Sequence, residues 1–225
     1  MNIHLLLEMA ADAFPDRIAI GGHEDGINYA RLLAQSRRAA VALQSKPSAT
    51  VVFLGLNSAA LPVALFSSSM AGKPFAPLNY RLADADLCRL VARTAPSALI
   101  VDDAMVGRIE AVDGVDVLPR THFQRIAEAP PGVSNPTEAS SELAVLLFTS
   151  GTTGEPKAAV LRHRNLTSYV ISTVELMIAD PSEAALVSVP SYHIAALSAV
   201  LTSVYAGRRV VYLPAFTADA WVETP

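Results

Sequence analysis

The chain has 225 residues and a formal net charge of −4, and 52% of its residues are hydrophobic. This composition supplies enough apolar surface for a folded core and is not typical of disordered chains. Nucleic-acid-binding proteins carry an excess of Lys and Arg that neutralises phosphates, so the negative charge excludes that class of partner. The single cysteine, Cys88, excludes an intrachain disulfide and a cysteine-rich zinc module, and it favours a reducing, cytoplasmic location.

Two long runs without Asp, Glu, Lys or Arg, residues 47–72 and 184–207, raise the question of a membrane span. A spanning helix needs about 20 consecutive apolar residues. The first run is interrupted at Gly55 and Asn57, and the second is interrupted at Pro190. We therefore predict a buried strand, a turn and a buried helix in each run, and no transmembrane segment.

Short apolar runs alternate with amphipathic stretches from the beginning of the chain. Hydrophobic periodicity predicts helices over residues 5–14, 29–43, 58–71, 84–94 and 121–127, and strands over residues 18–20, 50–56, 74–77, 98–101 and 115–118. The run at 50–56 is apolar at nearly every position, as expected for a parallel strand covered by helices on both faces. The alternation predicts an α/β fold of layered, mostly parallel sheets flanked by helices.

A proline-rich stretch divides the chain. Residues 129–140 contain three prolines and one glycine, which disfavour regular structure. We predict a first α/β subdomain over residues 1–128, a linker over residues 129–140, and the start of a second α/β unit over residues 141–225. The second unit is predicted to have strands at 144–148, 158–161, 185–189 and 209–213, and helices at 164–178, at 194–205 and from 217.

The segment from Thr149 to Lys157 reads T-S-G-T-T-G-E-P-K and follows a predicted buried strand. Gly151 and Gly154 permit close approach of the backbone to a ligand, so successive N–H groups can bind an anion. Lys157 adds a mobile positive charge. Four hydroxyl groups add further donors: Thr149, Ser150, Thr152 and Thr153. These groups together predict a binding site for a polyphosphate.

This loop differs from the two nucleotide-binding loops that are most easily read from a sequence. A Walker A loop places Gly-Lys-Ser/Thr directly before a helix, whereas Pro156 precedes the lysine here and an apolar Ala-Ala-Val follows it. No G-x-G-x-x-G sequence occurs, so a Rossmann dinucleotide site is not supported. The plain alternative is a surface turn rich in Ser, Thr and Gly, which the position after a buried strand disfavours.

Residues 149–157 resemble the phosphate-binding signature of the adenylate-forming, acyl-activating superfamily, which includes acyl-CoA synthetases, luciferases and the adenylation domains of peptide synthetases. Residues 162–166 (R-H-R-N-L) are similar to its usual continuation, although Ala158 stands where glycine is usual. Residues 74–82 (P-F-A-P-L-N-Y-R-L) resemble an upstream segment of the family. Residues 190–193 (P-S-Y-H) resemble the acyl-CoA synthetase branch, whereas peptide synthetases usually carry a Phe-Asp-containing sequence there.

The resemblance implies an ATP-dependent acid–thiol ligase that uses ATP, Mg²⁺ and coenzyme A. A carboxylic acid, expected to be a fatty acid, is activated as an acyl-adenylate and is then transferred to CoA or to a carrier-protein thiol. The resemblance makes Lys157 a catalytic residue that holds the β- and γ-phosphates, and it places Thr152 near the metal and His193 near the acyl and nucleotide pockets. A core histidine bonded to a backbone carbonyl is the alternative for His193. The resemblance assigns nucleotide binding to the loop residues Thr149, Ser150, Gly151, Thr152, Thr153, Gly154 and Lys157.

The same resemblance implies parts that these residues do not contain: an adenine-binding aromatic-Gly-x-Thr-Glu sequence, a ribose-binding aspartate and a C-terminal domain with a catalytic lysine. The helix predicted from residue 217 has only begun where the sequence ends at Pro225. We therefore expect an N-terminal fragment that is inactive on its own. A non-catalytic interaction module with this fold, a fragment of an amino-acid adenylation domain and, least favoured, an unrelated P-loop NTPase are the alternatives.

Overall fold

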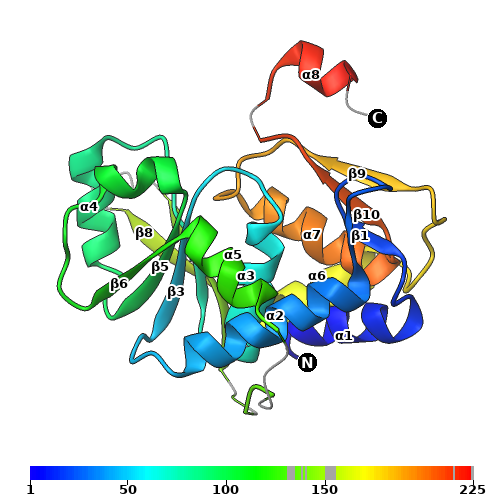
Figure 1. Cartoon of the computed structure of the whole chain (residues 1–225), viewed down its shortest axis with the longest axis horizontal. Helices are drawn as coiled ribbons and strands as arrows, with labels where there is room; N and C mark the ends of the chain where they lie inside the picture. Colours follow the sequence, from blue (N-terminus) through cyan, green and yellow to red (C-terminus); the bar gives the residue numbers. More distant parts are fainter. Residues whose placement is uncertain (131–134, 138, 140, 150–155, 215, 224–225) are drawn as a thin grey trace.

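The computed structural model describes residues 1–130, 135–137, 139, 141–149, 156–214 and 216–223 (Figure 1). Its helices are α1 His4–Ala13, α2 Tyr29–Gln44, α3 Ala60–Met70, α4 Asp84–Ala92, α5 Arg120–Glu128, α6 His163–Thr173, α7 Ile194–Ala206 and α8 Ala218–Glu223, with a short 3-10 helix η1 at Asp103–Arg108. Its strands are β1 Ile18–Ile20, β2 Ile27–Asn28, β3 Thr50–Leu54, β4 Phe75–Pro77, β5 Ser97–Val101, β6 Val115–Pro119, β7 Leu143–Thr149, β8 Lys157–Arg162, β9 Ala184–Val187 and β10 Arg209–Tyr212.

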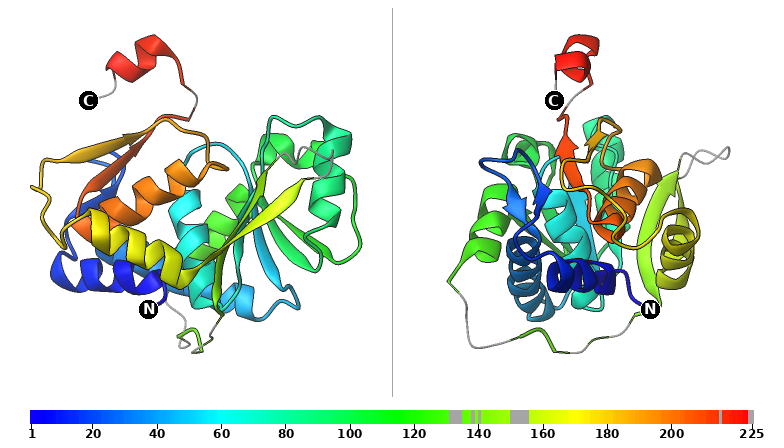
Figure 2. Two further views of the ribbon diagram at one scale, coloured as in Figure 1. Left: turned by 180° about the vertical axis from the view of Figure 1, so that it is seen from behind. Right: turned by 90° about the vertical axis from the view of Figure 1, so that its right-hand side faces the viewer.

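These strands form two sheets with helices packed against them (Figure 2). The six-stranded sheet has the order β6-β5-β3-β4-β7-β8, and its pairs are parallel except the antiparallel hairpin of β7 and β8. The four-stranded sheet has the order β2-β1-β10-β9, in which only β2 runs antiparallel to its neighbour. The predicted α/β class of mostly parallel sheets is confirmed.

Both sheets contain strands from either side of residues 129–140. β7 and β8 follow that stretch and extend the sheet that β3 to β6 begin, whereas β1 and β2 precede it and pair within the sheet of β9 and β10. The division of the chain into units 1–128 and 141–225 stays a prediction. Strands of the first range are hydrogen-bonded to strands of the second range in both sheets.

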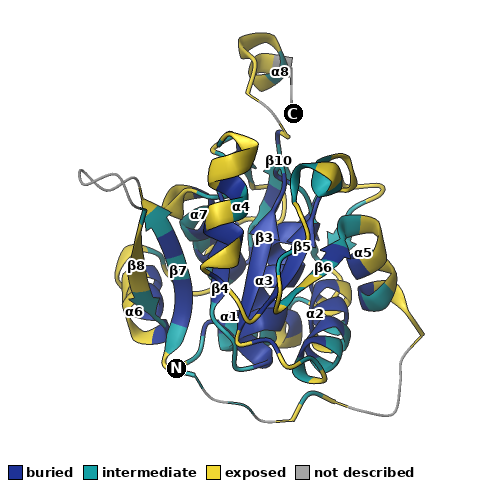
Figure 3. Cartoon of the chain, turned by 90° about the vertical axis from the view of Figure 1, so that its left-hand side faces the viewer, coloured by how far each residue is buried: buried dark blue, intermediate teal, exposed yellow. Residues whose placement is uncertain are grey.

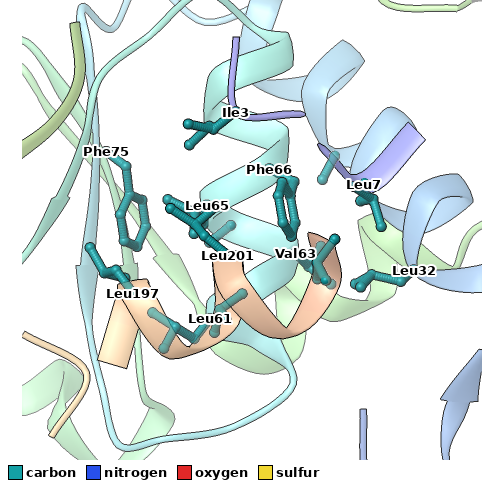
Figure 4. Packing of buried hydrophobic residues seen from close by; sticks show 14 of the residues in the cluster. Ile3, Leu7, Leu32, Leu61, Val63, Leu65, Phe66, Phe75, Leu197 and Leu201 are labelled. Atoms are coloured by element: carbon teal, nitrogen blue, oxygen red, sulfur yellow. The ribbon is translucent and has the colours of Figure 1, made fainter. Parts of the chain in front are cut away.

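The centre of the molecule is formed by α3 and by two strands of the larger sheet. All residues of α3, β3 and β5 are buried, as Figure 3 shows by colour. Figure 4 shows side chains of α3 pointing toward Leu201 of α7 and Phe75 of β4 on one side, and toward Leu7 of α1 on the other. A helix that has no exposed residue is covered on every face by the rest of the protein. None of the described helices is long and apolar enough to cross a membrane.

The predicted helix at 164–178 is too long. α6 ends at Thr173, and Val174 adopts an extended conformation with φ −138° and ψ 140°. The hydroxyl groups of Ser172 and Thr173 donate to Tyr169 O at 3.0 and 2.8 Å, a local competition with the helical backbone. The apolar side chain of Leu176, which lies within the predicted range, is 42% exposed.

The N-terminus is fastened by a buried histidine. The main-chain N–H of Ile3 donates to Nδ1 of His163 at 3.2 Å, so this imidazole must be neutral. Next to it, Nδ1 of His4 lies 2.9 Å from the hydroxyl of Ser69. Burial, together with the positive charges of the neighbouring His4 and the terminal amine, lowers the pKa of His163 to about 4.

Replacement of a core leucine tests the central position of α3. Leu65→Ala removes a side chain that is 0% exposed, whereas Leu176→Ala makes the same chemical change at a site that is 42% exposed. We expect Leu65→Ala to lower the free energy of unfolding by about 2–5 kcal/mol and Leu176→Ala to change it by about 0.5 kcal/mol or less. Urea unfolding with equal m-values measures both changes. Equal losses would contradict the assigned packing.

The His163 contact makes stability depend on pH. The pKa is about 4 in the folded protein and about 6.5 in an unfolded chain, so the unfolded state binds more protons between these values. Stability from this group is present above pH 6.5 and is lost as pH falls toward 4, by up to about 3 kcal/mol. His163→Ala should flatten the decline in free energy of unfolding between pH 7 and 5. A decline as steep as in the wild type would contradict this role.

Candidate functional site

The candidate site lies at the carboxyl edge of the larger sheet, where five parallel strands end on the same side. α3 follows β3 and packs on one face of this sheet, whereas α4 follows β4 and packs on the other face. In open α/β sheets, ligands bind at such an edge, where successive connections leave in opposite directions. The topology therefore indicates a site beside the ends of β3 and β4.

Asn57 joins this edge to the second sheet. Its Nδ2 group donates to Val187 O at 3.3 Å, to Val189 O at 2.9 Å and to Leu213 O at 3.3 Å. Val187 ends β9, and Leu213 follows β10 directly. The carboxyl ends of strands from both sheets thus meet at one buried side chain, which is 3% exposed.

The segment that carries His193 is fastened beside this junction. The hydroxyl of Ser191 donates to Gly55 O at 2.6 Å. The ring of Tyr192 stands edge-on to that of Tyr80, with centroids 5.3 Å apart and planes at 75°, and the imidazole of His193 lies 4.5 Å from Tyr192. His193 is the N-cap residue of α7 and is exposed. The alternative prediction, a core histidine, is therefore wrong.

Two clefts meet at the start of α7. A cleft of about 550 Å³ lies between Tyr80 and Arg81 on one side and Val189 and His193 on the other. A groove of about 590 Å³ runs between α6 and α7, with Leu161, Leu166, Tyr169 and Ala199 among its lining. Ile194 and Ala195 line both, so the imidazole of His193 stands beside the place where the cleft and the groove join.

The predicted phosphate-binding loop connects β7 to β8. Thr149 ends β7 and pairs with Lys157, which begins β8, and the hydroxyl of Thr149 donates to Lys157 O at 3.4 Å. Both side chains are exposed. Arg93, just after α4, donates to Pro156 O at 2.8 Å and so fastens the hairpin to the neighbouring helix. Thr149 lies on the same sheet edge as the ends of β3 and β4.

Five of the predicted nucleotide-binding residues lie outside the described residues: Ser150, Gly151, Thr152, Thr153 and Gly154. Their roles, and the metal-binding role of Thr152, stay predictions. Within the part of the chain that the structure describes, no three His, Cys, Asp or Glu side chains gather to hold a metal ion.

A glycine and an ion pair support the turn after β3. Oδ2 of Asp102 accepts from the main-chain N–H of Leu56 at 2.9 Å, and its Oδ1 lies 3.0 Å from Nη1 of Arg120. A Cβ on Gly55 would lie 2.5 Å from Asp102 Oδ1, so only glycine fits. The carboxylate thereby holds the turn that presents Asn57.

The structure brings together several residues that the sequence did not assign to a site, chiefly Asn57, Ser191, Tyr80 and Arg93. Asn57 had a recognisable signal, because it is a polar side chain inside a long uncharged run. Ser191 belongs to the motif that contains His193. The Arg93 contact joins residues far apart in the chain and carries no sequence signal.

Comparison with known proteins agrees with this geometry. The sequence profile described as AMP-binding enzyme matches residues 7–224. An indoleacetate–CoA ligase of Aromatoleum aromaticum is 29% identical over 98% of this chain and 46% of its own length. A feruloyl-CoA synthase of an Amycolatopsis species is 30% identical over 92% of this chain and 43% of its own length. The chain thus spans less than half the length of these relatives.

A solved structure shows the same arrangement of elements. ATP-bound MatB from Rhodopseudomonas palustris superposes with a TM-score of 0.82 at 26% sequence identity. The match covers 99% of this chain and 47% of that protein.

Proposed function

The chain belongs to the AMP-binding enzyme family, and from this premise we propose that it supplies the phosphate-binding hairpin and an acyl-binding wall of an ATP-dependent acid–CoA ligase. The observation that carries the proposal is the common edge. The hairpin with Thr149 and Lys157 leaves the same side of the sheet as the turns that hold Tyr80 and the His193 segment. A polyphosphate and an apolar acid can therefore be held at one edge.

The proposed reaction has two steps. An oxygen of the substrate carboxylate attacks the α-phosphorus of ATP, the bond from that phosphorus to the bridging oxygen breaks, and pyrophosphate leaves. The sulfur of CoA then attacks the acyl carbon, AMP leaves, and the thiol proton passes to solvent. In this proposal ATP and CoA are substrates, and Mg²⁺ held near Thr152 would neutralise phosphate charge.

Charge is the main demand of the first step, because negative charge accumulates on the departing pyrophosphate. Lys157 is an exposed cation at the start of β8, and it can hold the β- and γ-phosphates there. The hydroxyl of Thr149 lies across the hairpin from Lys157, and a bound phosphate oxygen would replace Lys157 O as the acceptor of its proton. His193, beside the junction of cleft and groove, is positioned to orient the substrate carboxylate.

The groove between α6 and α7 favours an acid with an apolar body. Its lining includes Leu161, Leu166 and Ile194. We keep the substrate class as an apolar carboxylic acid, of which a fatty acid is one member. An amino-acid substrate would need an anionic partner for its ammonium group, and none of the described residues that line the cleft or the groove is Asp or Glu. CoA is the proposed acceptor, with a carrier-protein thiol as the second candidate.

Removal of the lysine charge tests the hairpin. In the protein that shows the activity, we expect Lys157→Ala to slow acid-dependent exchange of pyrophosphate into ATP by roughly 10²-fold. Transfer from supplied acyl-adenylate to CoA should fall less, because its leaving group lacks the β- and γ-phosphates. Lys157→Arg, which keeps the charge, should retain more exchange activity. Equal loss in both steps would count against this role.

The 225 residues alone should bind Mg-ATP weakly and should have no ligase activity. The described residues offer one cation, Lys157, and one hydroxyl group, that of Thr149, for the phosphates. The adenine- and ribose-binding sequences implied by the family are not among the 225 residues. Isothermal titration of this chain with Mg-ATP measures the affinity. Binding tighter than about 1 μM, equivalent to roughly 8 kcal/mol, would contradict the prediction.

A further inference from the structure

We propose that Asn57 and Ser191 are positioning residues that hold His193 beside the cleft by fastening the segment 189–193 to the end of β3. The geometric part of this inference is independent of the activity. Only its effect on catalysis rests on the proposed function.

Asn57 supplies the first tie. Its Nδ2 group donates to Val189 O at 2.9 Å, and it shares its two hydrogens with the carbonyls of Val187 and Leu213 at 3.3 Å. A single amide therefore fixes the end of β9, the residue after β10 and the entry to the His193 segment. An apolar side chain of this size could offer none of these bonds.

The Asn57 side chain also has a buried oxygen that destabilises the folded state. Oδ1 of Asn57 is buried and accepts no hydrogen bond from any residue in the described ranges. A buried acceptor without a partner destabilises the folded state relative to an apolar residue of the same shape. The three donated bonds offset that cost, and they all act on the strand ends that surround the cleft. This favours a positioning role over a contribution to stability alone.

Ser191 supplies the second tie, only two residues from Val189. Ser191 is fully buried, and its hydroxyl donates to Gly55 O at 2.6 Å. Between the two ties lies Pro190, whose ring restricts the backbone and whose carbonyl accepts from the N–H of His193 at 3.0 Å. The backbone on the N-terminal side of His193 is therefore held at two points by the turn after β3.

Contacts between aromatic rings also hold His193, and they begin at Tyr80, three residues after β4. Tyr80 contacts Tyr192 edge-on, and Tyr192 contacts the imidazole of His193. Ser191 lies directly before Tyr192, so a shift at Ser191 moves both rings relative to Tyr80. The position of the imidazole thus depends on hydrogen bonds that do not touch it.

The decisive variant is Ser191→Ala, which removes one hydroxyl and leaves the backbone conformation available. The matched control is Ser36→Ala. Ser36 is also fully buried, and its hydroxyl donates to Leu32 O at 2.8 Å within α2. Both variants lose one buried hydrogen bond from a hydroxyl to a main-chain carbonyl, so Ser36→Ala shows the effect of such a loss away from the His193 segment.

The first measurement is made on this chain without nucleotide. Protein with ¹³C-labelled histidine is prepared, and the His193 ring resonance is assigned by His193→Gln. We expect Ser191→Ala to shift that resonance and to speed hydrogen exchange of the His193 amide by roughly tenfold. The exposed His23 and His122 serve as internal references. An unchanged His193 signal, or an equal change in Ser36→Ala, would overturn the inference.

The second measurement uses the protein that carries out pyrophosphate exchange. Ser191→Ala should lower kcat/KM for the acid by roughly tenfold while KM for ATP stays constant, and Ser36→Ala should change neither. Full activity in Ser191→Ala overturns the positioning role. If the His193 resonance shifts, but a protein that contains these residues together with the family's adenine- and ribose-binding sequences shows no exchange activity, the proposed function is overturned and the geometric inference is supported.

Asn57→Ala gives a further readout, since it removes all three donated bonds. We expect a larger displacement of the His193 resonance than in Ser191→Ala. A folded Asn57→Ala protein with the wild-type resonance would overturn the role of Asn57. If this variant does not fold, Asn57→Ser, which keeps a smaller polar group, is measured in the same way, with the same outcomes deciding.

Discussion

The buried amide of Asn57 connects the two sheets. Asn57 follows β3 of the larger sheet, and its hydrogen-bond partners lie at the carboxyl ends of two strands of the smaller sheet. Asn57 extends from the turn after β3, and its partners are carbonyls at the ends of β9 and β10. Each sheet alone would present a separate edge. Because this amide brings the two edges together, the Lys157 hairpin and the His193 segment lie along one joined edge, as the proposed two-substrate site requires.

The apolar core makes this junction possible. α3 is buried along its whole length, and it packs against α7 as well as against helices that cover the larger sheet. The helix therefore couples the two sheets from within, while Asn57 couples them at the edge. Gly55 lies in close contact with the carboxylate of Asp102, where no side chain would fit. The chain can therefore turn tightly there, and both Asn57 and the start of α3 follow within a few residues of β3.

Periodicity in the sequence was sufficient for the class of fold and for most of the helices and strands, because apolar spacing reports local burial directly. The same spacing extended α6 to residue 178, where Leu176 and Ile178 are exposed. The loop composition predicted a phosphate-binding role for residues 149–157, including Lys157, which stays a prediction, and it did not predict the antiparallel pairing of β7 and β8. It could not reveal the partners of Asn57 or the contact of Arg93 with Pro156, since these depend on the pairing of distant segments. Tyr80 belongs to residues 74–82, which resemble a family segment, but its contact with Tyr192 could be found only from the structure.

The smaller sheet joins the two extremes of the sequence. β1 pairs on one side with the two-residue β2, which is close to it in the chain. On its other side it pairs with β10, where Ile20 lies opposite Val210. Closing so long a loop is entropically slow. During synthesis, the edge of Ile18–Ile20 that pairs with β10 therefore stays unpaired until residues 209–212 have been made. The larger sheet can start forming earlier, so the region around His193 is completed at a late stage of folding.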